Sequence, residues 1–151
     1  MAKVFPHLWF NDQAEAAMAF YTSIFKDSEM LGRSVMPDPE LSVVRFALAG
    51  QPVVALNANS PAHYNESFSF LIETEDQDET DYYWNALIAD GGKEQPCGWL
   101  TDKFGVYWQV SPTRLLQLVA DPDREKAGRV LQAMYRMKKI VIADLERAYR
   151  G

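Results

Sequence analysis

The stretch that decides the fold is Ser42–Asn57, which reads SVVRFALAGQPVVALN. Its two arms, Ser42–Ala49 and Pro52–Asn57, are rich in apolar and β-branched residues, and Gly50-Gln51 stands between them. Such runs on either side of a short, glycine-containing connection are typical of a β-hairpin. We therefore predict two antiparallel strands joined by a tight turn at Gly50-Gln51.

The residues before this hairpin predict a strand, a helix and a further short strand. Val4–Phe10 is apolar and predicts the first strand. Asp12 is expected to cap a helix, with a glutamate three residues later as in a capping box. Apolar residues recur at helical spacing after it: Ala16, Ala17, Phe20, Tyr21, Ile24 and Phe25. With a strand at Arg33–Met36, residues 3–60 form one β-α-β-β-β module.

The same order of elements repeats in residues 65–111. Strands are expected at Ser67–Ile72, near residues 94–96, at Gly98–Thr101 and at Val106–Val110. Between the first two lies a helix that Thr74 would cap and Gly91-Gly92 would end. Two copies of one unit make a repeat of topology rather than of sequence.

Residues 112–151 predict a helical extension. Pro122 suits the first position of a helix, and a last short helix begins near Ile142. The fold class is therefore α+β, with paired βαβββ modules and C-terminal helices in a single domain spanning residues 1–151.

Composition excludes several classes of partner. The formal net charge is −6 and the pI about 4.9, so lysine and arginine are too few to favour nucleic acid or an anionic membrane surface. No apolar run approaches the roughly 20 residues that span a bilayer. The N-terminus lacks the pattern of a signal peptide, and a single cysteine, Cys97, cannot form an internal disulfide. We expect a cytoplasmic protein.

Several motifs together resemble one known family. They are Leu8-Trp9-Phe10, Gly50-Gln51, Cys97-Gly98-Trp99-Leu100 and the run from Asp102 to Val110, in that order and spacing. The chain is similar to the PhnB-like branch of the vicinal oxygen chelate (glyoxalase/bleomycin resistance/dioxygenase) superfamily, often labelled a 3-demethylubiquinone-9 3-methyltransferase domain. The resemblance implies a homodimer and a U-shaped cleft between the two modules. No glycine-rich S-adenosylmethionine loop follows the first strand, so the residues do not support a methyltransferase.

Metal-dependent relatives take their ligands from the first and last strand of each module. The resemblance places those positions near Phe5, Ala55, Ser67 and Gln109. Of these only Gln109 is a good ligand, and a divalent ion needs several that converge. We predict no cofactor; a divalent metal, if one is bound, would use His7 and Gln109.

The candidate ligand-binding residues are His7, Trp9, Asn57, Ser67, Ser69, Tyr107 and Gln109. His7 is either a displaced ligand or base, or a structural histidine at the rim. Strand aromatics such as Trp9 and Tyr107 either fill the core or line a concave pocket, whereas Trp108 faces the other way. Cys97 is either a reactive thiol or a structural residue.

Three functions follow as hypotheses. The favoured one is a metal-free module that binds a small, partly aromatic molecule in the cleft. The alternative is a metal-dependent lyase, isomerase or dioxygenase of the vicinal oxygen chelate type. The third is an interaction dimer in which the C-terminal helices cover the sheet or the partner.

Overall fold

The computed structural model describes residues 1–151, which form two compact units, Met1–His63 and Tyr64–Gly151. The boundary falls in the Asn- and Ser-rich loop between the two predicted modules. The second unit also contains the C-terminal extension. None of the helices is long and apolar enough to cross a bilayer.

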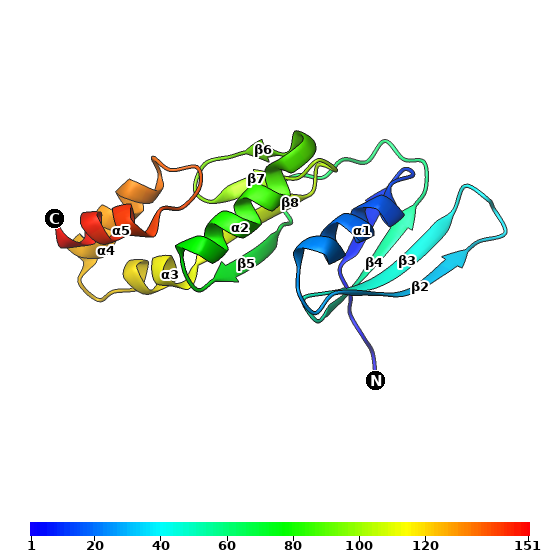
Figure 1. The fold of residues 1–151 in the computed structure, drawn as a ribbon, viewed down its shortest axis with the longest axis horizontal. Coiled ribbons are helices and arrows are strands. Elements are labelled where there is room, and N and C mark those ends of the chain that lie inside the picture. The colour runs from blue at the N-terminus through cyan, green and yellow to red at the C-terminus, as the bar shows by residue number, and fades with distance from the viewer. The chain divides into compact units, whose positions relative to one another are not determined.

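The first unit is a β-α-β-β-β module, as the sequence predicts (Figure 1). Its elements are β1 (His7–Phe10), α1 (Ala14–Ile24), β2 (Glu29–Val35), β3 (Ser42–Leu48) and β4 (Gln51–Asn57). The sheet order is β1-β4-β3-β2, with β1 parallel to β4 and the other pairs antiparallel. Helix α1 covers one face of this sheet.

The second unit repeats this topology and then adds three helices. Its elements are β5 (Phe70–Thr74), α2 (Gln77–Ile88), the single turn η1 (Ala89–Gly91), β6 (Lys93–Glu94), β7 (Trp99–Thr101), β8 (Tyr107–Pro112), α3 (Thr113–Val119), α4 (Arg124–Met134) and α5 (Ile142–Arg150). The sheet order is β5-β8-β7-β6, with β5 parallel to β8. The two sheets therefore have the same connectivity.

Burial alternates along β1, β3 and β8, so each sheet has one covered face and one helix-free face. In the first sheet the buried side chains lie against α1; they include Leu8, Phe10, Val44, Phe46 and Ala55. In the second sheet Leu100, Trp108 and Val110 are buried with Trp84 and Leu87 of α2. The helix-free faces carry the intervening residues.

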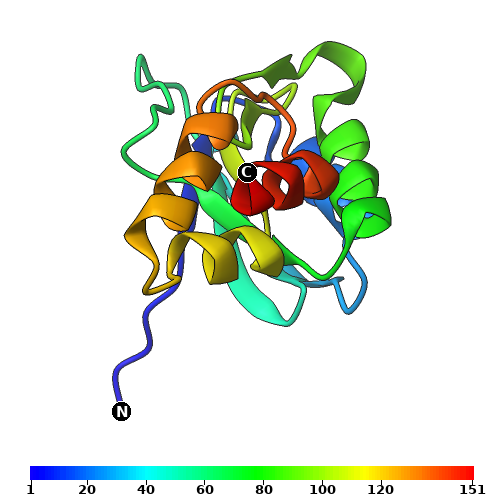
Figure 2. The ribbon, with the colours of Figure 1, turned by 90° about the vertical axis from the view of Figure 1, so that its left-hand side faces the viewer.

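The extension is anchored firmly to the second unit. Figure 2 shows α3, α4 and α5 grouped together, and they enclose a small core of their own: Leu115, Leu118, Val130, Ile140 and Leu145. The Gln77 side chain accepts the Ile142 N–H at 2.8 Å and donates to the Ile140 carbonyl at 3.1 Å. The backbone N–H groups of Cys97 and Gly98 donate to the carbonyls of Met137 and Lys138.

The last helix begins at Ile142, as predicted, but the predicted caps of α1 and α2 are wrong because other side chains supply the hydrogen bonds. The residue before α1 is Gln13, whose side chain caps nothing, and the first N–H of the helix donates to Asn57 instead. Asp76, not Thr74, caps α2. Thr74 ends β5 in the core, where its hydroxyl bonds that of Thr80 at 2.6 Å.

Other boundaries also differ. The hairpin turn is Ala49-Gly50 rather than Gly50-Gln51, because Leu48 pairs with Gln51 and both turn residues have positive φ. Strand β5 begins at Phe70, three residues late. Helix α4 begins at Arg124 behind the cap Asp123, and α3 was not predicted separately.

Substituting Gly98 tests how tightly the extension is packed. At φ +82° an added Cβ would lie 2.9 Å from the Val110 carbonyl oxygen and 3.1 Å from Ile140. We expect Gly98→Ala to lower the free energy of unfolding by about 3 kcal/mol. Gly50→Ala is the matched control, because its φ is +78° but nothing lies within 4 Å, so it should lose only about 1 kcal/mol. Equal losses in urea denaturation would contradict the packing argument.

Candidate functional site

The helix-free face of the second sheet gathers polar and aromatic side chains around Gln109. Its Nε2 donates to the Ser69 hydroxyl at 2.9 Å. In the ladder Gln109 pairs with Leu71 of β5 on one side and with Trp99 of β7 on the other. Tyr107 lies two residues before it on the same face, while Trp108 points into the core and donates to Asp102.

This face presents hydrogen-bonding atoms that the protein does not use. The Gln109 Oε1, the Trp99 indole N–H and the Tyr107 hydroxyl form no hydrogen bond within the chain. All three residues are half-buried, so part of each side chain still reaches solvent. Amphipathic rings beside an oriented amide are typical of small-molecule sites.

The helix-free face of the first sheet carries the two residues predicted on β1. His7 and Trp9 are both exposed and share this face, as their spacing predicts. The Trp9 Nε1 donates to the Ala58 carbonyl at 2.7 Å, which fixes the ring with 44% of the residue still exposed. Trp9 is thus an oriented aromatic surface rather than a core residue.

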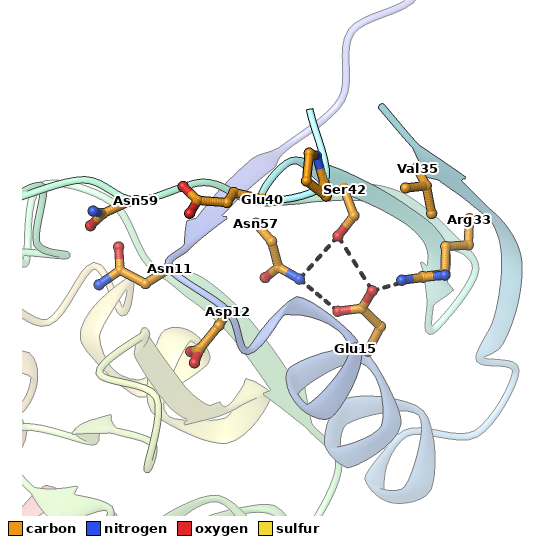
Figure 3. A pocket seen from close by; sticks show the side chains of 10 residues that line it. Asn11, Asp12, Glu15, Arg33, Val35, Glu40, Ser42, Asn57 and Asn59 are labelled. Atoms are coloured by element: carbon orange, nitrogen blue, oxygen red, sulfur yellow. Dashed lines mark hydrogen bonds and ion pairs between the residues drawn. The ribbon is translucent and has the colours of Figure 1, made fainter. Parts of the chain in front are cut away.

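Asn57 lies on the opposite, covered face, at the N-terminus of α1 (Figure 3). Its Oδ1 accepts the Ala14 N–H at 2.8 Å, and its Nδ2 donates to Glu15 at 2.7 Å and to Ser42 at 3.1 Å. Glu15 also accepts from Arg33 at 2.9 Å. The amide is thereby fully used, so Asn57 has no group left for a ligand.

The network around Asn57 forms the wall of an open, polar cavity of about 620 Å³. The other lining residues are Asn11, Asp12, Val35, Pro39, Glu40 and Asn59. Burial raises the pKa of the Glu15 carboxyl, but the hydrogen bonds from Arg33 and Asn57 outweigh it and hold the pKa below its ordinary value. Glu15 is therefore ionised at neutral pH and serves as an anchor.

The remaining predicted residues are dispersed. Ser67 lies in a turn before β5, where its N–H donates to the Asn65 side chain, and so is not on the sheet. Cys97 is half-buried and has a φ of +63°. Its backbone N–H donates to the Met137 carbonyl. Both histidines of the chain, His7 and His63, belong to the other unit, so no histidine of its own unit is available to activate the thiol.

The side chains do not fit a divalent metal within either unit. No three His, Cys, Asp or Glu residues come together in the chain. Ala55, at one of the ligand positions that the resemblance implies, is fully buried against α1, and Phe5 has no donor atom. Gln109 and Ser69 alone supply fewer than the several oxygen or nitrogen ligands such an ion requires.

Sequence reasoning missed Trp99 and the Glu15–Arg33 pair. Trp99 faces Gln109 across two antiparallel strands, and only their register places the two side by side. Arg33 and Glu15 are 18 residues apart in the chain, and no local motif connects a helix start to a neighbouring edge strand.

Comparison with known proteins places the chain in a defined group. The family profile described as 3-demethylubiquinone-9 3-methyltransferase matches residues 2–111. No curated protein sequence matches significantly. Among solved structures, a PhnB protein from Bacillus cereus is 28% identical, with a TM-score of 0.67, over 74% of this chain and 99% of its own.

Two further structures share the fold at lower identity. Protein PA1353 from Pseudomonas aeruginosa is 22% identical over 74% of this chain and 98% of its own, with a TM-score of 0.60. The fosfomycin resistance protein FosX from Listeria monocytogenes, in complex with Mn(II) and sulfate, is 19% identical over 72% and 89%, with a TM-score of 0.54. The family match ends at residue 111, before the three-helix extension begins.

Removing the Asn57 amide should destabilise the first unit. Asn57→Ala leaves the buried Ala14 N–H without an acceptor and Glu15 without a donor, so we expect a loss of about 2 to 3 kcal/mol in the free energy of unfolding. Asn59→Ala, an exposed asparagine of the same cavity, should change it by less than about 0.5 kcal/mol. Urea denaturation at neutral pH compares them; equal effects would argue against the capping role.

The Glu15 carboxylate should make stability depend on pH. Its pKa in the folded state lies below the ordinary value of 4.5, so its contribution is present above pH 4.5 and is lost as pH falls through the lowered pKa. The difference in unfolding free energy between wild type and Glu15→Gln should therefore be larger at pH 7 than at about pH 3. Glu40→Gln is the control, because its carboxylate accepts no hydrogen bond. A difference for Glu15→Gln that does not change with pH would refute the assignment.

Proposed function

Because this chain belongs to the 3-demethylubiquinone-9 3-methyltransferase family and has the vicinal oxygen chelate fold, we propose that it is a small-molecule binding protein. The site is the helix-free face of the second sheet, around Gln109. It takes an uncharged, partly aromatic ligand without a chelated metal ion, and the protein acts as a homodimer.

The observation that carries this proposal is the environment of Gln109. The bond to Ser69 holds the side-chain amide in one orientation, so its Oε1 is available to accept from a ligand N–H or O–H. Leu71 and Trp99 flank it in the ladder and supply apolar surface on both sides. A planar ligand that stacks on Trp99 and donates one hydrogen bond to Gln109 satisfies both features.

The charge pattern favours a neutral ligand. Charged residues of the sheet lie only at the margins of this face, where Glu73 pairs with Ser111 and Lys93 with Thr101. The middle of the face, between Ser69 and Trp99, is neutral. An ionic ligand would lose its hydration there without meeting an opposite charge.

The family description does not by itself supply a reaction. The chain passes from β1 to α1 through Asn11-Asp12-Gln13, with no glycine that would let a cofactor approach the backbone. FosX binds Mn(II), but at 19% identity it shares the fold alone. Metal-dependent lyase, isomerase or dioxygenase chemistry is the competing function.

Nuclear magnetic resonance with a library of neutral aromatic amides and phenols tests the proposal. Binding should shift the Trp99 indole and Gln109 side-chain signals and leave the Trp108 indole, on the covered face, unchanged. Gln109→Ala should weaken binding about tenfold by removing one hydrogen bond, whereas Gln51→Ala, in the hairpin of the other unit, should not.

Two results would count against this function. One is a hit whose shifts avoid Trp99 and Gln109 altogether. The other is stoichiometric metal in protein purified without chelator, together with a higher melting temperature on addition of Mn(II), since this would favour the metal-dependent enzyme.

A further inference from the structure

A groove runs between α4 and α5 in the extension, beyond the part of the chain that the family profile matches. It is open and has a volume of about 550 Å³, and four of its lining residues are small: Gly128, Ala133, Ala148 and Gly151. Gln132 and Arg136 form its rim together with Arg129. Arg129 is fully occupied, since it donates to the Ala148 and Tyr149 carbonyls and pairs with Glu125.

Charge is distributed unevenly within the second unit. Residues 64–111 contain two basic and ten acidic residues, a net charge of −8. Residues 112–151 contain nine basic and five acidic residues, a net charge of +4. Two ion pairs within the chain, Lys139–Asp81 and Lys138–Glu94, already join the basic segment to the acidic one. Arg136 at the groove rim is exposed and has no ion-pair partner in the chain.

The outer face of α2 has the opposite character. Its inner face is buried through Trp84 and Leu87. Outward it presents Asp78 and, one turn later, Tyr82, which is 52% exposed. The only other residue of the helix that is exposed is Asn85. Glu75, just before the helix, is also exposed. The Tyr82 ring, with the carboxylates of Asp78 and Glu75 near it, is complementary in shape and charge to a shallow groove that is lined by small residues and by Arg136.

We propose that the α4–α5 groove binds the outer face of α2 from a second copy of this chain. Tyr82 packs over Gly128 and Ala133, and Asp78 faces Arg136 across the contact. Both surfaces belong to the same unit, so in a two-fold pair each copy contributes one of each and the contact is made twice.

A second copy suits the groove better than another protein because the matching surface is already present at equal concentration. Coulomb attraction between the −8 and +4 segments also favours this orientation over one that brings like surfaces together. This contact needs α4 and α5, so a relative that ends where the family profile ends cannot make it. It gives the proposed homodimer a surface of its own and does not depend on the ligand face.

Charge reversal tests the contact in the full-length protein. Arg136→Glu and Asp78→Lys each break both copies of the pair, so each should raise the dissociation constant measured by sedimentation equilibrium by about tenfold. An equimolar mixture of the two variants restores a complementary pair at both contacts and should associate about as tightly as wild type. Arg124→Glu, the same charge reversal at the start of α4 and outside the groove, is the control and should leave association unchanged.

The outcomes separate cleanly. Weakened single variants with recovery in the mixture support the proposal, as does weaker association of wild type in about 0.5 M salt. A monomeric wild type, or association that the reversals do not alter, overturns it. Loss in both variants without recovery in the mixture also overturns it, because the two residues would then not face each other. Ligand binding at Gln109, measured on the same variants, reports on the proposed function independently.

Discussion

The first unit depends on one buried side chain, the amide of Asn57. It stands at the end of β4, yet it accepts the first N–H of α1 and donates to Ser42 at the start of β3 and to Glu15 in the helix. Through Glu15 it reaches Arg33 on the edge strand β2. A buried polar group must be satisfied or it destabilises the fold, so this amide fixes where the helix begins relative to three strands at once. The orientation of α1 decides which sheet face stays uncovered.

The second unit reaches the same topology by a different route. Helix α2 is capped by its own Asp76, and the end of β8 passes directly into α3 without a loop. In the first unit the strand residue Asn57 connects the helix start to other elements. In the second unit Gln77 does this, because its side chain hydrogen-bonds the backbone at Ile140 and Ile142 and so connects the extension to the start of α2. The repeat is therefore one of connectivity, while the interactions that hold each copy together are unrelated.

The order of elements could be predicted from the sequence because period-two and period-3.6 patterns are local. The alternation that separates Trp108 from Tyr107 and Gln109 is equally local, and the structure confirms it. The cap of α1 could not be predicted, since the acceptor for its first N–H lies 43 residues away and nothing near Gln13 reveals it. Asn57 illustrates the limit best. Sequence spacing correctly placed it at the end of a strand, but only the packed structure shows that its amide is consumed by the protein.

This distinction also separates polar residues that build the fold from those available for function. Asn57 and Gln109 are both amides on the last strand of a module, one on the covered face and one on the helix-free face. Burial under α1 surrounds the first with partners on every side, whereas the second has a single partner, Ser69, and an open oxygen. A site arises where the sheet holds a polar group in place without satisfying it. By that criterion the proposed ligand site lies on the helix-free face of the second sheet, and the network beneath α1 is the scaffold that the first unit requires.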